Sequence, residues 1–518
     1  METDGGLLFF IKPIRNLYVM ENSITDNIAE SRANSFINRK IILRILGILL
    51  FIEAGMFMVC TGISLWYREA DYIYFVYAAL INVAVGCVFS LLGRKARNVV
   101  TRRDGYCIVA FTWLLFTAFG MLPFYISGEI PSVTDAFFET MSGLTTTGAT
   151  ILDNIEELPH SMLFWRSFTQ WVGGLGIVFF TIAVLPIFGV GNQVLFSAEA
   201  TGVTHDKIHP KISVMAKWLW TVYLVLTLAS FVLLLLGGMD WFDAACHAFT
   251  TAGTGGYSTK QASISYWNSP FIEYVIAVFM MLSSVNFSLY FMCLKGRYKP
   301  LIHDDEVKWF FTSVLVLTLL ISASLVYYNG YGVELAFRKA LFQVAAIHTS
   351  CGFATDDYNV WPPFTWMLLV YAMLAGGCTG STAGGIKNMR LVIVVRNIKN
   401  EFSRLMHPRA VLPVKVNRQT VSRSTISTVT VFVLFYFICV FVGWIVLMFL
   451  GLGLTEAFGV VVSSLGNIGP GLGAYGPAFS WNALPDLAKW IASFLMLIGR
   501  LELFGILLLF APSFWKKR

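Results

Sequence analysis

Four short segments rich in serine, threonine and glycine recur along the chain, each at the same distance from a charged residue. In each segment the charged residue precedes an alanine, and a glycine follows 13 residues after the charge. The four pairs are Asp135 with Gly148, Asp243 with Gly256, Lys339 with Gly352, and Glu456 with Gly469. A single such segment would usually be a turn, but four occurrences of one spacing indicate an internal repeat.

The residue types in one repeat suit a short helix that begins near a membrane surface and ends inside the membrane. Three of the four charges are acids, which the positive N-terminal end of a helix dipole favours, and the negative C-terminal end favours a cation. The sequence offers no reason for Lys339 at this position. Glycine then allows the backbone angles and close approach that inward-facing carbonyl groups need. Four such segments around one axis predict rings of carbonyl oxygens, which replace the water shell of an alkali cation.

The elements that must position these segments are strongly apolar. The chain has 518 residues, of which 57% are hydrophobic and 13% are charged, whereas a soluble domain carries about 25% charged residues. Lipid must therefore cover the surface. Ten apolar stretches are long enough to cross a bilayer as helices. The predicted spans are residues 41–66, 72–93, 106–127, 162–189, 214–237, 270–294, 308–328, 363–395, 425–450 and 487–513.

Lysine and arginine gather in short loops between these spans. The basic loops are residues 94–103, 295–308 and 396–423, and the chain also ends on three basic residues. The positive-inside rule makes these loops cytoplasmic, so both termini are predicted to be cytoplasmic. The net charge of +7 lies in these loops and does not indicate a nucleic-acid partner. A second role for the loops is contact with anionic lipid or with a partner protein.

Four sequence strings point to a known family. They are residues 141–150 (MSGLTTTGAT), 254–258 (TGGYS), 348–353 (HTSCGF) and 467–471 (NIGPG). With these strings the chain resembles the Trk/Ktr/HKT superfamily of cation uptake proteins, and within it the bacterial TrkH type. The resemblance extends over residues 36–515.

The resemblance implies an all-α polytopic membrane protein with about ten transmembrane helices. Two N-terminal helices precede four units, each made of a span, a pore half-helix, a filter loop and a second span, around a central pore. The implied boundaries are residues 1–35 for an N-terminal cytoplasmic extension, 36–103 for the two-helix domain, and 104–192, 193–298, 299–410 and 411–518 for repeats one to four. The third repeat would hold a gating loop.

The resemblance also implies a potassium filter. Its residues would be Thr146, Thr147, Gly148, Gly255, Gly256, Ser350, Cys351, Gly352, Asn467, Ile468 and Gly469. Some plant relatives have serine at the first of the four glycines and prefer sodium, so glycine at position 148 favours potassium. Potassium would be the transported ion, and no bound cofactor is implied. The residues themselves form no metal-spaced cluster and no catalytic constellation, so we expect no enzyme activity.

A glycine-rich segment interrupts the eighth span. Its glycines are Gly376, Gly377, Gly380, Gly384 and Gly385. So many glycines do not form a regular lipid-facing helix. One interpretation is a kink packed against neighbouring helices, and the other is a mobile loop across the pore below the filter. The resemblance supports the second, because the family has a gating loop in this span.

Arg500 is an isolated charge in the last span. A cation in mid-membrane costs about 2.5–3.5 kcal/mol on insertion scales, so such residues usually face protein or water. Glu502 is two residues away and faces another side of a helix, which makes it a poor partner. Snorkelling or a structural ion pair is the alternative. The resemblance implies that Arg500 lies in the pore beside the glycine segment, with Lys387 contributing in a similar way.

Partners and rival functions complete the expectations. The chain has no evident regulatory domain, and the resemblance implies a homodimer in the bacterial inner membrane, gated by a cytosolic nucleotide-binding (NAD or ATP) subunit of the TrkA type. Broken helices and repeats also occur in secondary transporters that couple a solute to sodium or protons. A membrane subunit that only anchors partners is a further alternative.

Overall fold

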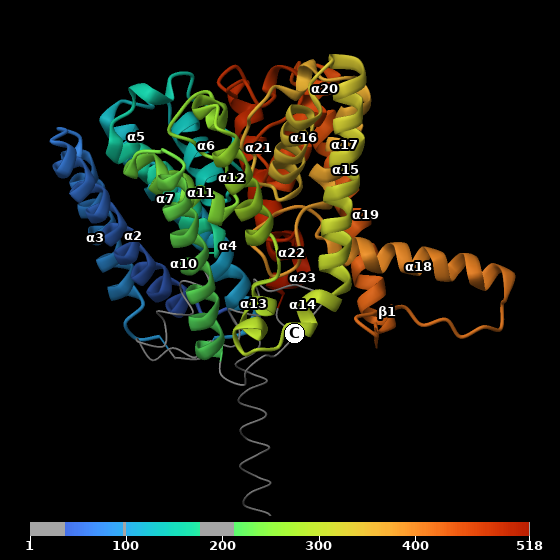
Figure 1. Ribbon diagram of the computed structural model, residues 1–518. Coiled ribbons are helices and arrows are strands. Elements are labelled where there is room, and N and C mark those ends of the chain that lie inside the picture. Colours follow the sequence, from blue (N-terminus) through green and yellow to red (C-terminus); the bar gives the residue numbers. More distant parts are fainter. Residues whose placement is uncertain (1–36, 97–99, 177–211, 517–518) are drawn as a thin grey trace, which may run out of the picture.

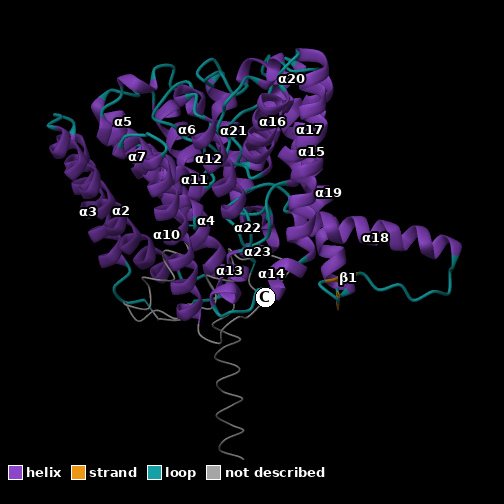
Figure 2. Cartoon of the chain, in the orientation of Figure 1, coloured by secondary structure: helices purple, strands orange, loops and turns teal. Residues whose placement is uncertain are grey.

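The computed structural model of the chain describes residues 37–96, 100–176 and 212–516. Helices dominate these residues, and the described strands are one short antiparallel hairpin, β1 (Lys415–Val416) and β2 (Gln419–Thr420) (Figure 2). The predicted N-terminal extension, residues 1–35, lies outside the described residues. The predicted all-α polytopic fold is therefore confirmed for the part of the chain that the structure describes.

Two long helices form an N-terminal pair at one side of the bundle (Figure 1). They are α2 (Arg39–Tyr67) and α3 (Tyr72–Leu92). Their backbones approach closely where a Cβ on Gly47 would lie 2.8 Å from the carbonyl oxygen of Gly86. Small residues permit such close helix packing in membranes. The outer face of α3 stays apolar and exposed, with Leu80 and Leu91 at 60% and 67% exposure, as a lipid-facing helix requires.

Four units of the same design follow this pair. The first helices of the units are α4 (Arg102–Gly120), α10 (Ile212–Leu236), α15 (Asp305–Asn329) and α19 (Arg423–Phe449). The half-helices are α6 (Val133–Leu144), α11 (Trp241–Gly253), α16 (Val333–His348) and α20 (Leu454–Gly466). The second helices are α7 (His160–Gly174), α12 (Pro270–Ser283), α17 (Pro363–Ala375) and α21 (Asp486–Arg500).

Six further helices connect or extend these units in the described part of the chain. They are α5 (Leu122–Ser127), α13 (Phe287–Leu294), α14 (Lys299–His303), α18 (Asn388–Met406), α22 (Phe504–Phe510) and α23 (Pro512–Trp515). Helix α18 extends sideways out of the bundle, whereas the half-helices lie in its upper half (Figure 1). The basic segment around α14 and the C-terminal end lie together at the lower end.

The half-helices are too short to cross a bilayer and are buried by protein instead. Each has 12 to 16 residues, which at 1.5 Å per residue gives about 18–24 Å, less than the hydrocarbon core of about 30 Å. The side chain of Ser132 caps α6 by accepting a hydrogen bond from the Asp135 amide at 3.3 Å. The later turns of the half-helices are buried, as Val344 of α16 and Val461 of α20 show with 0% exposure each.

Two of the predicted spans are wrong as continuous helices. Residues 270–294 form α12 and α13, which bend by 92° at a break, and residues 487–513 are interrupted after Arg500. At the first break the glycine-rich segment inserts its own backbone. The Cys378 amide donates to Ser284 O at 2.9 Å, and the Phe287 amide donates to Gly380 O at 3.1 Å. The helix can stop there because the inserted segment satisfies the freed backbone groups.

The number of spans is less regular than ten long helices. Within the described residues, six helices are long and apolar enough to cross a membrane, and the bent pair would make a seventh. The eighth predicted span, residues 363–395, is interrupted as expected, but its second part belongs to α18. Part of the fourth, residues 162–189, lies outside the described residues from position 177 on. The count of ten stays a prediction.

Candidate functional site

The four half-helices all end in the same backbone turn. In every repeat a polar residue adopts positive φ, and a glycine with positive φ follows two positions later. The pairs are Thr146 (54°) and Gly148 (85°), Thr254 (53°) and Gly256 (79°), Ser350 (53°) and Gly352 (83°), and Asn467 (53°) and Gly469 (99°). A non-glycine residue in this conformation costs about 1–2 kcal/mol, so the polar position is held there by its surroundings. We call these segments, residues 145–149, 253–257, 349–353 and 466–470, the repeat loops.

The repeat loops close on one another in chain order. A Cβ added to the glycine of one loop would lie under 3.0 Å from a carbonyl oxygen of the next loop. The contacts run from Gly148 to Gly255 O, from Gly256 to Cys351 O, from Gly352 to Ile468 O, and from Gly469 to Thr147 O. The last contact returns to the first repeat, so the four loops form a closed ring. Only glycine fits such an approach of backbone to backbone.

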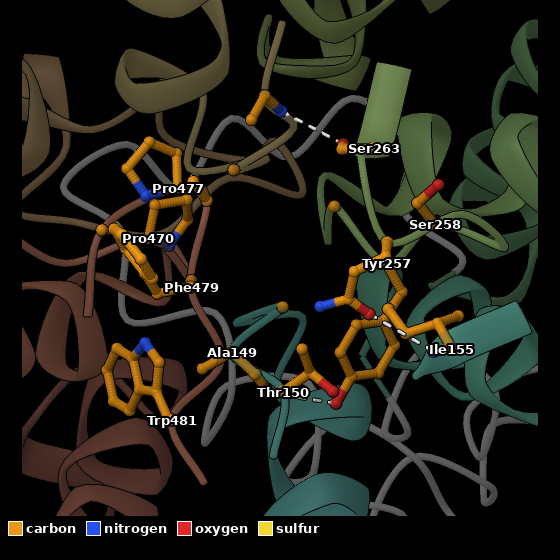
Figure 3. A pocket seen from close by; sticks show the side chains of 18 of the residues that line it. Ala149, Thr150, Ile155, Tyr257, Ser258, Ser263, Pro470, Pro477, Phe479 and Trp481 are labelled. Atoms are coloured by element: carbon orange, nitrogen blue, oxygen red, sulfur yellow. Dashed lines mark hydrogen bonds between the residues drawn. The ribbon is translucent and has the colours of Figure 1, made fainter. Parts of the chain in front are cut away.

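A cavity of about 70 Å³ lies on the outer side of this ring. All four ring glycines line it, together with residues that follow them, and Figure 3 shows Thr150, Tyr257 and Pro470 around the opening. The basic side chains in the lining are paired: Arg166 Nε lies 2.9 Å from Glu139 Oε1, and Lys260 Nζ lies 3.8 Å from an Asp243 oxygen. Each of these two basic side chains thus has a carboxylate partner.

Buried side chains hold the ring from behind. The Gln170 amide nitrogen donates to Gly255 O at 2.7 Å, while its oxygen accepts from the Tyr257 amide at 3.0 Å. The Asn467 side chain donates to Thr147 Oγ1 at 3.1 Å and to Met496 O at 2.8 Å. Hydrogen bonds between buried groups hold the ring carbonyls and the loop side chains in fixed positions. Gln170 lies outside the four sequence strings, so the sequence did not reveal that it holds the ring.

In three of the four repeats, the residue at the same position of the half-helix forms a hydrogen bond to the segment that follows the repeat loop. This position lies nine residues before the ring glycine. Glu139 accepts the Ile151 amide at 3.0 Å, His247 bonds Ser258 Oγ at 2.9 Å, and Gln343 donates to Asp356 O at 2.9 Å. Each bond ties the half-helix to the chain that leaves the repeat loop.

The structure explains the lysine that breaks the acidic pattern. Lys339 Nζ lies 3.4 Å from Glu273 of α12 and donates to Thr355 O at 2.7 Å. At the junction of repeats four and one the charges are reversed, because Asp135 of α6 lies 2.6 Å from Lys489 of α21. Glu273 and Lys489 both occupy the fourth position of their helices. An ion pair therefore joins repeats two and three, and another joins repeats four and one with the acid and the base exchanged.

The glycine-rich segment lies directly beneath the ring. We call residues 376–387 the glycine loop. Thr382 Oγ1 donates to Ala252 O at 3.3 Å, and the Gly384 amide donates to Ser350 Oγ at 2.6 Å. A Cβ on Gly384 would clash with Gly466 O. The loop thus contacts the C-terminal ends of the second, third and fourth half-helices.

Several of the glycines make this loop compact. Gly376, Gly380 and Gly385 have positive φ of 69°, 76° and 78°, and a Cβ on Gly376 would collide with the backbone of Gly384 and Gly385. Gly377 touches Ala383 in the same way, where a Cβ would lie 2.5 Å from the alanine Cβ. The two limbs of the loop therefore lie against each other. The segment is therefore packed against the helices around it, and its role as a gating loop stays a prediction.

Arg500 closes the remaining side, under the first repeat. Its guanidinium donates to Thr146 Oγ1 at 3.2 Å, to Gly174 O at 2.8 Å and also to Gly173 O. It further donates to Thr382 O of the glycine loop at 2.9 Å. The arginine therefore joins the end of the first repeat to the loop, and its charge lies beneath the ring.

The remaining charges around the loop have other roles. Glu502, which the sequence judged a poor partner for Arg500, pairs with Arg390 of α18. The Lys387 ammonium is buried and donates to Ala383 O within the loop. Among the described residues, no group of three or more His, Cys, Asp or Glu side chains could hold a metal ion. The backbone ring is thus the candidate site for an ion.

These features define a class of protein. A multi-pass helical membrane protein with four pseudo-repeated pore-loop units around one axis is built to pass a small ion. The sequence model of the TrkH family, described as cation transport protein, matches residues 74–517. The chain belongs to the TrkH family of cation transport proteins, and the family is one of transporters, not enzymes.

Known proteins of this family match along nearly the whole chain. The Trk system potassium uptake protein TrkH of Escherichia coli K12 is 38% identical over 481 residues, covering 92% of this chain and 99% of that protein. Its relative TrkG of the same organism is 34% identical over 459 residues, covering 88% and 94%. The crystal structure of the potassium transporter TrkH from Vibrio parahaemolyticus aligns with a TM-score of 0.83 and 36% identity, covering 92% of this chain and 99% of that one. The resemblance inferred from the four strings is confirmed.

Proposed function

We propose that this protein takes up potassium through the ring of four repeat loops, across the bacterial inner membrane. The observation that carries the proposal is the closed ring, in which each glycine lies against a carbonyl of the next repeat. Carbonyl rings of this kind replace the hydration shell of an alkali cation. The names of the relatives, potassium uptake proteins, favour potassium as that cation.

The ion would be coordinated by the repeat loops. The proposed filter residues are Thr146, Thr147, Gly148, Gly255, Gly256, Ser350, Cys351, Gly352, Asn467, Ile468 and Gly469. To these we add Thr254, because its positive φ of 53° matches the first position of the other three loops. The C-terminal ends of four half-helices point their negative dipole ends at this place. No side-chain carboxylate is needed to attract the ion.

Uptake would run down the electrochemical gradient. The membrane potential contributes about 2.3 kcal/mol per unit charge for each 100 mV, which suffices to concentrate potassium inside a cell. An ion leaving the ring inward next meets the glycine loop and the Arg500 guanidinium, which lie in its path. We infer that these two elements form the gate. The gate is closed in this structure, because the backbone of the glycine loop and the Arg500 guanidinium together cover the exit of the ring.

The orientation follows from charge. Helices α13 and α14 lie at the end of the bundle opposite the half-helices (Figure 1), and the segment where they meet carries the exposed residues Lys295, Arg297 and Lys299. We propose that this end faces the cytoplasm and that both termini are there. The same basic face is where a cytosolic nucleotide-binding subunit of the TrkA type would dock.

A homodimer is supported by the shape of α18. This helix leaves the bundle (Figure 1), yet it carries a row of exposed apolar side chains. They are Val395, Ile398, Phe402, Leu405 and Met406, each 45% to 78% exposed. Their spacing of three and four residues places them along one stripe of the helix. Such a stripe on an extended arm is suited to burial against a second copy of the chain.

The test is cation flux into proteoliposomes that hold the purified chain. We expect potassium and rubidium flux well above sodium and lithium flux, and an increase in flux when Arg500→Ala removes the charge below the ring. Arg404→Ala is the matched control, since Arg404 forms an exposed pair with Glu401 on α18 and its loss should leave flux unchanged. Equal flux of all four cations would contradict the potassium filter. Proton-coupled flux of an organic solute without cation flux would favour a secondary transporter instead.

A further inference from the structure

A buried carboxylate holds the glycine loop from outside. Glu306 lies in the first turn of α15 and is 2% exposed. Both hydrogen-bond donors to its Oε1 oxygen are backbone amides. The Thr379 amide lies 2.6 Å away and the Met389 amide lies 2.8 Å away. A carboxylate removed from water needs strong donors, and charge-assisted bonds of this length supply them.

The two donors lie on either side of the gate. Thr379 is in the first limb of the glycine loop, and Met389 is the second residue of α18, directly after the loop. The first amides of a helix have no acceptor within the helix, and the N-cap residue Lys387 provides no side-chain bond. Glu306 therefore acts as the N-terminal cap of α18, supplied by a different helix. The positive end of the α18 dipole stabilises its charge.

One oxygen thus fastens both ends of the segment that blocks the axis. Between the two anchored amides lie Thr382 and Gly384, the residues that contact the half-helix ends. Asn388 adds a second tie, because its side chain donates to Gly376 O at 2.6 Å. With its ends joined at Glu306, the loop has little freedom to swing away from the ring.

Glu306 belongs to a run of three acids whose other members do different work. Asp304 caps α15 by accepting the Glu306 and Val307 amides, both at 2.9 Å. Asp305 pairs with Arg396 at 2.7 Å. These two satisfy the start of α15 and its contact with α18, so the third acid is not needed for either purpose.

We propose that Glu306 is a positioning residue of the gate, whose carboxylate keeps the glycine loop closed under the ring. The proposal rests on the proposed gating function of the loop. Without the carboxylate, two buried amides lose their acceptor in the closed position and can regain water when the loop moves. The loss of one such bond already shifts the balance between closed and open by about tenfold.

The first test is potassium flux in proteoliposomes without any partner protein. We expect Glu306→Ala to raise the flux about tenfold while the ratio of potassium to sodium flux stays unchanged, because the ring is built by other residues. Glu306→Gln keeps an oxygen acceptor for both amides and should stay closer to the parent protein. Glu53→Ala is the matched control. Glu53 is a buried carboxylate in α2, bonded to Asn82 at 3.0 Å, and its loss should not raise the flux.

The second test reads the loop position directly. Cys378 of the glycine loop and Cys351 of the ring are both fully buried. The test uses a variant in which these two are the remaining cysteines. We expect Glu306→Ala to expose Cys378, but not Cys351, to a membrane-impermeant thiol reagent, measured by mass spectrometry. Equal exposure of both cysteines would show that Glu306 supports the whole fold, and would overturn a role specific to the gate.

The outcomes separate this proposal from the proposed function. If Glu306→Ala leaves flux and Cys378 labelling unchanged while Arg500→Ala raises flux, the gate stands and Glu306 is not its anchor. If neither substitution raises flux in a protein that conducts potassium, the gate itself is wrong.

Discussion

Serine in place of Gly352 is the sharpest test of the closed ring. The glycine has φ of 83°, and a Cβ there would fall about 1 Å short of the 3.0 Å that real Cβ atoms keep from an oxygen, here Ile468 O. It would also lie 2.7 Å from Pro470 Cδ. Since the colliding atom is backbone, the carbonyl itself has to move. The substitution should therefore damage the ring at the third and fourth repeats together.

The size of the effect follows from the backbone. A non-glycine residue at this φ costs about 1–2 kcal/mol, and the ring either bears that strain or relaxes and loses a carbonyl ligand. In both cases we expect the preference for potassium over sodium to fall by about 5- to 30-fold. Flux of the four alkali cations into proteoliposomes measures it.

A matched control separates strain from the ring geometry. Gly128, at the end of α5, has the same φ of 83°, but nothing lies within 4 Å of an added Cβ. Gly128→Ser should reduce stability by a similar amount and leave cation selectivity unchanged. If Gly352→Ser behaves like Gly128→Ser in the flux assay, the repeat loops do not select the ion.

Three further predictions concern the supports of the pore. Gln170→Leu removes the bonds to Gly255 O and the Tyr257 amide, and the unpaired buried groups, at about 1–3 kcal/mol each, should lower potassium flux; unchanged flux and selectivity would show that Gln170 is only packing. Lys489→Ala leaves the partly buried Asp135 without its partner and should destabilise the protein by about 1–3 kcal/mol, seen as a lower melting temperature in detergent. An effect no larger than that of an exposed ion pair would show that this ion pair does not stabilise the contact between repeats four and one. Phe402→Glu should convert the proposed homodimer to monomer in native mass spectrometry without loss of flux per chain, and a persistent dimer would exclude α18 as its interface.

The sequence predicted the register of the repeat loops because the register is a local property. The spacing of 13 residues between charge and glycine placed all four ring glycines at equivalent positions. Applied more strictly, the same spacing also gives Thr254, which lies two residues before Gly256 as Thr146 lies before Gly148. The expected filter residues left Thr254 out, because two glycines follow it and the second repeat was assigned to Gly255 and Gly256 alone.

The breaks in the second spans were beyond prediction for a physical reason. Residues 270–294 are mostly apolar, and their hydropathy indicates one continuous helix. Helix α12 ends at Ser283, and at the break the Cys378 amide, nearly a hundred residues later in the chain, donates to the Ser284 carbonyl. Long-range backbone bonds of this kind leave no periodic signal in the sequence. Lys339 is similar, since its partner Glu273 belongs to another repeat.

The ring and the proposed gate differ in how many repeats supply them. Each of the four units contributes one loop to the ring, but the glycine loop comes from the third unit and Arg500 from the fourth. All four loops belong to a single polypeptide, so one glycine can be replaced while the other three stay intact, and the damage from one, two, three or four identical substitutions can be compared at fixed stoichiometry. A gate present once in each pore opens in a single event. Its response to an activating signal should therefore be graded with a Hill coefficient near one within each chain, and any steeper response must arise from coupling between chains.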